Sequence, residues 1–333
     1  MKLLLKIVVA VGLLWSLYWY GAGYMVRQGI TAWFEARQAE GWQADFADIS
    51  TSGYPLQHVT TLTSPALADP ATGTAWQADW LVLGNPAIWP GKQTVQFPAS
   101  VQRLSYFDQT VELTATGMVA DLHLNPGTAL EVDRMALASG PWVVATQGAP
   151  ILGGQSLDLS MQNTSAPATY RFNLVAPDFA LDDSLRRTIG SAGALPETFQ
   201  SLELDMTVTF DRPWDRRALE ERRPQPVAID LRLARAEWGP LSLFAAGAVT
   251  VDAAGVPTGT VNFKAENWQD MIEIARQSGA VPEYTLKPAA QILDLLSRIS
   301  GNREALDVEL TLADGRVSLG PFPLGSAPIL RLR

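Results

Sequence analysis

The longest apolar run of the chain lies at its N-terminus. Lys2 and Lys6 precede an uncharged stretch from Ile7 to Val26, which ends at Arg27. About 20 apolar residues span a bilayer core as a helix, at ~1.5 Å per residue. Aromatic residues crowd the distal part of the run, as in an interfacial belt: Trp15, Tyr18, Trp19, Tyr20 and Tyr24. The pattern predicts a transmembrane helix from Ile7 to Val26 within an anchor of residues 1–26.

The charges around this run predict its orientation. Lys2, Lys6 and the free amine favour a cytoplasmic N-terminus by the positive-inside rule. The rest of the chain then lies outside, which in a Gram-negative cell means the periplasm, so we expect a single-pass protein of the bacterial inner membrane. A cleaved signal peptide is the alternative, although its apolar region usually has only ~7–15 residues. The only passable cleavage site is Gly21-Ala22-Gly23.

The apolar pattern then narrows to one face of a helix. Ile30, Trp33, Phe34 and Arg37 follow at helical spacing, and Gly41 can end the helix. This predicts one continuous helix to Glu40, with residues 27–40 as a stalk. We expect Ile30, Trp33 and Phe34 to contact an open end of the following domain, with the lipid interface as the alternative. If Trp33 is fully buried there, Trp33→Ala should cost ~3 kcal/mol or more.

After residue 40, strict alternation of apolar and polar residues is the clearest signal. The run from Leu202 to Phe210 places Glu203, Asp205, Thr207 and Thr209 between apolar positions. Alternation of this kind predicts antiparallel strands with one buried face and one solvent-exposed face. We therefore expect Leu204, Met206 and Val208 to be buried and Asp205 to be exposed, so that Asp205→Asn costs under ~0.5 kcal/mol. Similar runs lie at 157–161, 170–174, 227–233, 241–251, 261–265 and 306–312.

Three helices are expected to cover these one-sided strands. One is predicted over Asp178 to Ile189, one after an Asn267 cap, and one from Pro288 to Gly301. Their inward residues are Leu181, Leu185 and Ile189; Trp268, Met271, Ile272 and Ala275; and Ile292, Leu295, Leu296 and Ile299. The predicted fold is α+β and β-dominated, a transmembrane helix followed by long, curved, antiparallel amphipathic sheets covered by a few short helices. Residues 41–333 form one β-rich domain, with two possible halves at 41–177 and 197–333 joined by a helical segment.

The sequence contains few candidates for catalytic, metal-binding or nucleic-acid-binding residues. The formal net charge is −9 with no long basic run, which argues against a nucleic-acid partner. Cysteine is absent, and His58 and His123 lie far apart with no partner at metal-ligand spacing. No nucleotide-binding or hydrolase motif occurs, and no pair of carboxylates is singled out. We therefore predict no catalytic, metal or cofactor-binding residue, no cofactor, and no enzymatic activity.

Several stretches resemble the proteobacterial domain of unknown function 2125 family. They are Gly41-Trp42, Ser52 to Pro55, Asp69 to Trp76, Asp252 to Trp268 and Gly315 to Pro328. The resemblance implies a membrane-anchored or exported envelope protein with no established activity. The turn Gly255 to Gly259 and the strand after it are also similar to hairpins in AsmA-like envelope proteins, by pattern alone.

Eight tryptophans lie beyond the helical stalk, from Trp42 to Trp268, and they could serve core packing or line an apolar groove. The leading hypothesis is a non-enzymatic periplasmic module whose one-sided sheets hold a lipid or another hydrophobic ligand. A scaffolding protein that acts through contacts with other envelope proteins is the alternative. A hydrolase of envelope glycans or lipids comes third.

Overall fold

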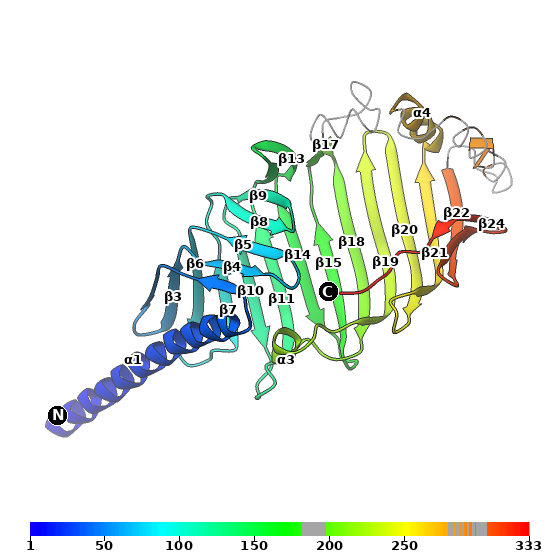
Figure 1. Ribbon diagram of the computed structural model, residues 1–333. Helices are drawn as coiled ribbons and strands as arrows, with labels where there is room; N and C mark the ends of the chain where they lie inside the picture. The colour runs from blue at the N-terminus through cyan, green and yellow to red at the C-terminus, as the bar shows by residue number, and fades with distance from the viewer. Residues whose placement is uncertain are drawn as a thin grey trace.

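The protein is β-dominated, as the sequence predicted, with two large antiparallel sheets behind a long N-terminal helix (Figure 1). This computed structural model describes residues 1–181, 198–278 and 305–332, together with Glu283, Lys287, Ala290, Gln291, Leu293, Asp294 and Ser297. The helices with described bounds are α1 (Lys2–Ala39), α3 (Arg216–Glu220) and α4 (Trp268–Ser278).

The larger sheet, here the long sheet, has 15 strands. In spatial order they are β2 (Asp48–Ser52), β3 (Gln57–Thr63), β6 (Trp80–Pro86), β7 (Lys92–Gln96), β10 (Val119–Leu124), β11 (Val132–Ser139), β14 (Leu157–Asn163), β15 (Thr169–Val175), β18 (Ser201–Phe210), β19 (Pro226–Trp238), β20 (Leu241–Val251), β21 (Pro257–Glu266), β22 (Ala305–Ala313), β23 (Arg316–Leu319) and β24 (Phe322–Ser326). The pairing of β15 with β18 bonds the two predicted halves of the domain directly to each other.

The smaller sheet, here the short sheet, has nine strands. They are β1 (Gln43–Asp45), β4 (Ala66–Asp69), β5 (Thr74–Gln77), β8 (Gln102–Tyr106), β9 (Gln109–Ala115), β12 (Trp142–Thr146), β13 (Ala149–Gly154), β16 (Phe179–Leu181) and β17 (Thr198–Phe199). Successive hairpins alternate between the sheets: β2–β3 joins the long sheet, β4–β5 the short sheet, and so on to β17. From β18 onward every described strand joins the long sheet, so the short sheet covers only its N-terminal part.

One apolar row crosses the long sheet from β10 to β23. Residues directly opposite each other on paired strands point to the same face. Successive pairings therefore align Leu122, Met135, Met161, Phe172, Met206, Leu231, Gly247, Val261, Leu310 and Leu319. This face packs on the short sheet at one end of the molecule and on α4 at the other.

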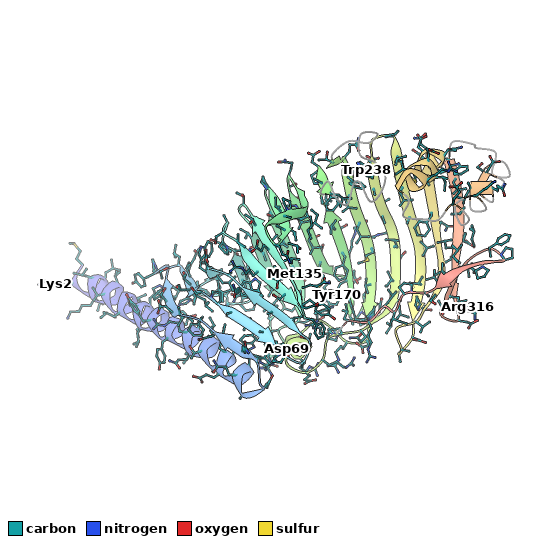
Figure 2. The ribbon with its side chains drawn as sticks, turned by 45° about the horizontal axis from the view of Figure 1, so that its top comes forward. Lys2, Asp69, Met135, Tyr170, Trp238 and Arg316 are labelled. Atoms are coloured by element: carbon teal, nitrogen blue, oxygen red, sulfur yellow. The ribbon has the colours of Figure 1, made fainter. Side chains whose placement is uncertain are left out.

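The core is divided into clusters along this face. Met135 and Tyr170, which belong to one cluster, lie near each other in the middle of the molecule (Figure 2). Tyr170 is fully buried beside Val208 and Phe210, and its hydroxyl accepts the backbone N–H of Trp214 at 2.9 Å. Burial raises the pKa of the Tyr170 phenol to about 12. The predicted burial is right for Val208, whereas Leu204 and Met206 are only half-buried.

One of the predicted helices differs from expectation at its start, and another forms as predicted. The segment predicted to begin a helix at Asp178 instead forms β16, because Phe179 and Ala180 pair with β13 and β17. The remainder of that segment, including Leu185 and Ile189, lies outside the described residues. Helix α4 has the predicted inward residues Trp268, Met271 and Ile272. Asn267, directly before α4, adopts a left-handed φ of 56°, and its side-chain amide donates to the Pro240 carbonyl.

The third predicted helix is described only in part. Ala290, Gln291, Leu293, Asp294 and Ser297 are helical, and Leu293 packs against the cluster of Trp268. The expected inward residues lie outside the described residues: Ile292, Leu295, Leu296 and Ile299.

Helix α1 is continuous from Lys2 to Ala39, as predicted, and within the described residues it is the one helix long and apolar enough to cross a membrane. A helix of this kind at the N-terminus serves as a membrane anchor or as a signal sequence. Its C-terminal part packs on the domain: Phe34 is 6% exposed against Ala44 and Leu62, and Ile30 packs on the same cluster. Trp33 is 40% exposed, so the full burial on which a cost of ~3 kcal/mol or more depended is not met.

We expect Phe34 to contribute more to stability than Trp33. Phe34→Ala should cost ~3–5 kcal/mol, because it leaves a cavity beside Phe46, whose ring centroid lies 4.9 Å away. Trp33→Ala should cost only ~1–2 kcal/mol, because much of its ring is already in water. Chemical denaturation of the full chain in detergent micelles measures both, and equal losses would contradict the packing described above.

A second prediction corrects the expected neutrality of Asp205. Its carboxylate accepts hydrogen bonds from Arg171, with Nη2 at 2.7 Å, and from Arg232. The bond from Arg171 is the main reason that the pKa of Asp205 is lowered. Asp205→Asn should therefore cost ~0.5–1 kcal/mol at neutral pH.

The pH dependence follows from the sign of this shift. Because the pKa of Asp205 is lower in the folded than in the unfolded protein, its ionised carboxylate stabilises the fold at any pH above the unfolded pKa of about 3.9. This stabilisation is lost as the pH falls through the pKa of the folded state. Denaturation midpoints of the wild type and Asp205→Asn should thus converge in acid. Asp230→Asn, at an exposed position of β19, is the control. It should change the denaturation midpoint little, both at neutral pH and in acid. A constant difference between the wild type and Asp205→Asn across the whole range would refute the ion-pair explanation.

Candidate functional site

A cavity of about 430 Å³ lies between α1 and the two sheets. We call it the helix-exit cavity because it begins at Val26, where the charge-free part of α1 ends. Its lining residues are all apolar: Val26, Gly29, Ile30, Trp33, Phe34, Leu62, Pro65, Leu67, Trp76, Leu81 and Leu83. Ligand-binding cavities of ~300–1,000 Å³ are common, and this one is within that range.

Both sheets contribute a strand pair to the cavity. Leu62 on β3 pairs with Leu81 on β6 in the long sheet, and Leu67 on β4 pairs with Trp76 on β5 in the short sheet. Helix α1 lies across the open end between these pairs (Figure 1). The alternation of hairpins between the sheets therefore creates the gap, and the stalk of α1 partly fills it.

The three predicted contact residues all line this cavity. Ile30 and Phe34 pack into the domain, while Trp33 lies over Phe34 with ring centroids 5.3 Å apart. Gly29 leaves space beside them, because a Cβ atom there would meet no atom within 4 Å. The helix thus contributes an apolar wall with one open position.

Two polar side chains near the cavity make contacts outside it, although Gln102 Nε2 and Arg37 Nε are buried without a hydrogen-bond partner. The indole N–H of Trp76 donates to the Gln102 side-chain oxygen at 3.3 Å, so its ring presents only carbon to the cavity. The Arg37 guanidinium, one turn after Trp33, lies 5.7 Å from the Trp33 and Trp42 ring centroids and pairs with Glu40 at 2.7 Å. The cavity can therefore hold an alkyl or aromatic group, and none of its lining side chains carries a charge.

The sequence did not predict a second contact between α1 and the domain. Trp19 is 4% exposed, and its indole N–H donates to the Gln57 carbonyl at 2.9 Å. The His58 ring stacks on Trp19 at 4.8 Å and donates from Nε2 to the Trp19 carbonyl at 3.0 Å. Gly23 allows this approach, because a Cβ there would lie 3.4 Å from both His58 and Thr51.

The histidines therefore have structural partners. His58 joins the helix to β3, and the Nε2 atom of His123 accepts from Arg134 at 3.2 Å. Among the described residues, no group of three His, Asp or Glu side chains is placed to hold a metal ion.

Comparison with known proteins identifies a family but no activity. No curated protein matches the chain. The predicted similarity to AsmA-like proteins is not shown by these comparisons. A family model described as "Uncharacterized protein conserved in bacteria (DUF2125)" matches residues 19–328. The match begins at the buried Trp19 and covers nearly the whole chain. The chain therefore belongs to the DUF2125 family.

Proposed function

We propose that this protein is a non-enzymatic, membrane-anchored module of the bacterial envelope that accepts an acyl chain of a membrane lipid in the helix-exit cavity. The observation that carries the proposal is the wholly apolar lining of the cavity at the point where α1 leaves its charge-free stretch. The anchor would lie in the inner membrane with a cytoplasmic N-terminus, and the β-rich domain in the periplasm.

Retention of α1 is supported by its bonds to the domain. Cleavage at Gly21-Ala22-Gly23 would remove Trp19, which is buried and joined by hydrogen bonds to Gln57 and His58. A signal peptide that is removed has no reason to form part of the folded core. The helix therefore acts as an anchor and as a structural element of the domain.

The position of the cavity supports a lipid as its occupant. Val26 is the last residue before Arg27, the first charged residue after Lys6, so the cavity begins near the expected membrane surface. Acyl chains are the apolar groups nearest to that point. Since no lining residue carries a charge, the cavity would select for an alkyl chain and leave the headgroup outside.

The scaffolding alternative predicts a different occupant. An apolar segment of another envelope protein would also fit a carbon-lined cavity, and it would cross-link as protein. A hydrolase would need polar groups at the cavity, and the lining supplies none.

Photo-cross-linking in membranes tests the proposal. A benzoylphenylalanine at Trp76, which lines the cavity, should give an adduct with the mass of a membrane lipid. The same residue at Gln77, the exposed neighbour on β5, should not. A protein adduct at position 76, or the same lipid yield at both positions, would reject acyl-chain binding in the cavity.

Filling the cavity provides an independent test. Gly29→Leu places a side chain in the open position and should reduce the position-76 lipid adduct about tenfold, since overfilling a site costs ~1–3 kcal/mol. Gly21→Leu is the matched control, because Gly21 is also helical with open space beside it but does not line the cavity. Equal lipid yield from the two variants would show that the ligand binds elsewhere.

The orientation is tested separately. Alkaline phosphatase fused to the C-terminus should be active, because the positive-inside rule places that end in the periplasm. A reporter that functions only in the cytoplasm should be inactive at the same position. Activity of the cytoplasmic reporter would refute the orientation.

A further inference from the structure

Two loops of the long sheet expose large apolar side chains beside α1. The first, residues 53–56, joins β2 to β3 and exposes Tyr54 (49%) and Leu56 (74%). The second, residues 87–91, joins β6 to β7 and exposes Ile88 (77%) and Trp89 (38%). No Asp, Glu, Lys or Arg occurs at positions 49–68 or 80–91, so both loops are free of charge.

Hydrogen bonds fix the loops to the middle of α1. The indole N–H of Trp15 donates to the Pro55 carbonyl at 3.1 Å, and the hydroxyls of Ser16 and Tyr54 lie 2.8 Å apart. The Tyr18 hydroxyl donates to the Ala87 carbonyl at 2.7 Å. The loops are also bonded to each other, because the Ala87 N–H donates to the Leu56 carbonyl at 2.9 Å. They therefore lie at a fixed height along the helix, level with residues 15–19.

That height lies inside the stretch expected to cross the membrane. Residues 7–26 span about 30 Å, the thickness of a bilayer core. Trp15 is 12 residues before Arg27, about 18 Å along the axis. If the loops stayed in water, only residues 3–14 would remain for the bilayer, about 18 Å of helix. That length is too short to cross a core of about 30 Å.

Several polar atoms in and next to the loops have hydrogen-bond partners within the protein. Backbone groups that face hydrocarbon need partners within the protein. The carbonyls of Pro55, Leu56 and Ala87 accept the bonds described above, and the N–H groups of Gln57 and Trp89 donate to Gly53 and Pro86. Pro55, Pro86 and Pro90 have no N–H to satisfy.

We propose that these two loops insert into the hydrocarbon core of the bilayer together with α1, so that the bilayer is the partner of this surface. Tyr54, Leu56, Ile88 and Trp89 would be surrounded by lipid, and Lys92, the first charge after the second loop, would reach the headgroups. The domain would then be held at a fixed height and rotation instead of moving freely on a tether. This inference does not depend on a ligand in the helix-exit cavity.

The absence of cysteine from the chain allows a direct test by single-site spin labelling. The full chain carrying Leu56→Cys or Ile88→Cys is labelled with a nitroxide, reconstituted in vesicles of phosphatidylethanolamine and phosphatidylglycerol, and isolated by flotation. Leu17→Cys, on the lipid-exposed part of α1, is the positive control. Leu324→Cys, an exposed apolar position on β24 at the opposite end of the long sheet, is the matched negative control.

Accessibility to oxygen and to a water-soluble nickel complex measures the depth of each label. Labels at positions 56 and 88 should resemble the label at 17, with high oxygen and low nickel accessibility. The label at 324 should show the reverse. Nickel accessibility at 56 or 88 equal to that at 324 would overturn the proposal. Loss of nickel accessibility without a gain in oxygen accessibility would also overturn it, because that pattern indicates cover by protein, such as a second copy of the chain.

Discussion

The packing of α1 against the open end of the two sheets is the contact on which the rest of the structure depends. Strands β3 and β6 of the long sheet and β4 and β5 of the short sheet diverge there, and an open end of this kind exposes apolar side chains to water. Phe34 and Ile30 cover part of it. Trp19 and His58 form a second contact along the same helix. A single helix that is long and apolar enough to cross a membrane therefore also completes the domain.

The regular alternation of hairpins between the two sheets explains how the rest of the β-rich domain is arranged. Up to β17, successive hairpins join the long sheet and the short sheet in turn. The apolar faces of the two sheets therefore lie opposite each other and bury each other. The short sheet then ends, with Phe199 stacked on Trp238 at 4.6 Å, while the apolar row continues to β23. The half-buried residues of β18 to β22 belong to this second region, where α4 covers one end of the face.

The sequence predicted the features that depend on local periodicity. The continuous helix follows from uninterrupted helical spacing, and the long strands follow from strict alternation over five to eleven residues. It did not predict the assignment of strands to two sheets, because short strands such as β4 and β5 carry no signal for the sheet they join. The predicted helix at Asp178 failed because Phe179 to Leu181 pair with a distant strand, which local propensity cannot show. Asp205 appeared to be an ordinary wet-face residue because its arginine partners lie 27 and 34 positions away.

The candidate site was predictable only in its helical half. Ile30, Trp33 and Phe34 share one helical stripe, whereas Leu67, Trp76 and Leu81 come from strands that only the fold brings together. The aromatic residues of α1 were interpreted as an interfacial belt, which accounts for their composition but not for their bonds to Pro55, Gln57 and Ala87. An aromatic side chain with a polar tip suits both roles, because its ring can face lipid while its N–H or O–H satisfies a loop carbonyl. If the loops insert as proposed, the same chemistry that suits these residues to a membrane surface would also allow the domain to bond to the helix within the apolar layer.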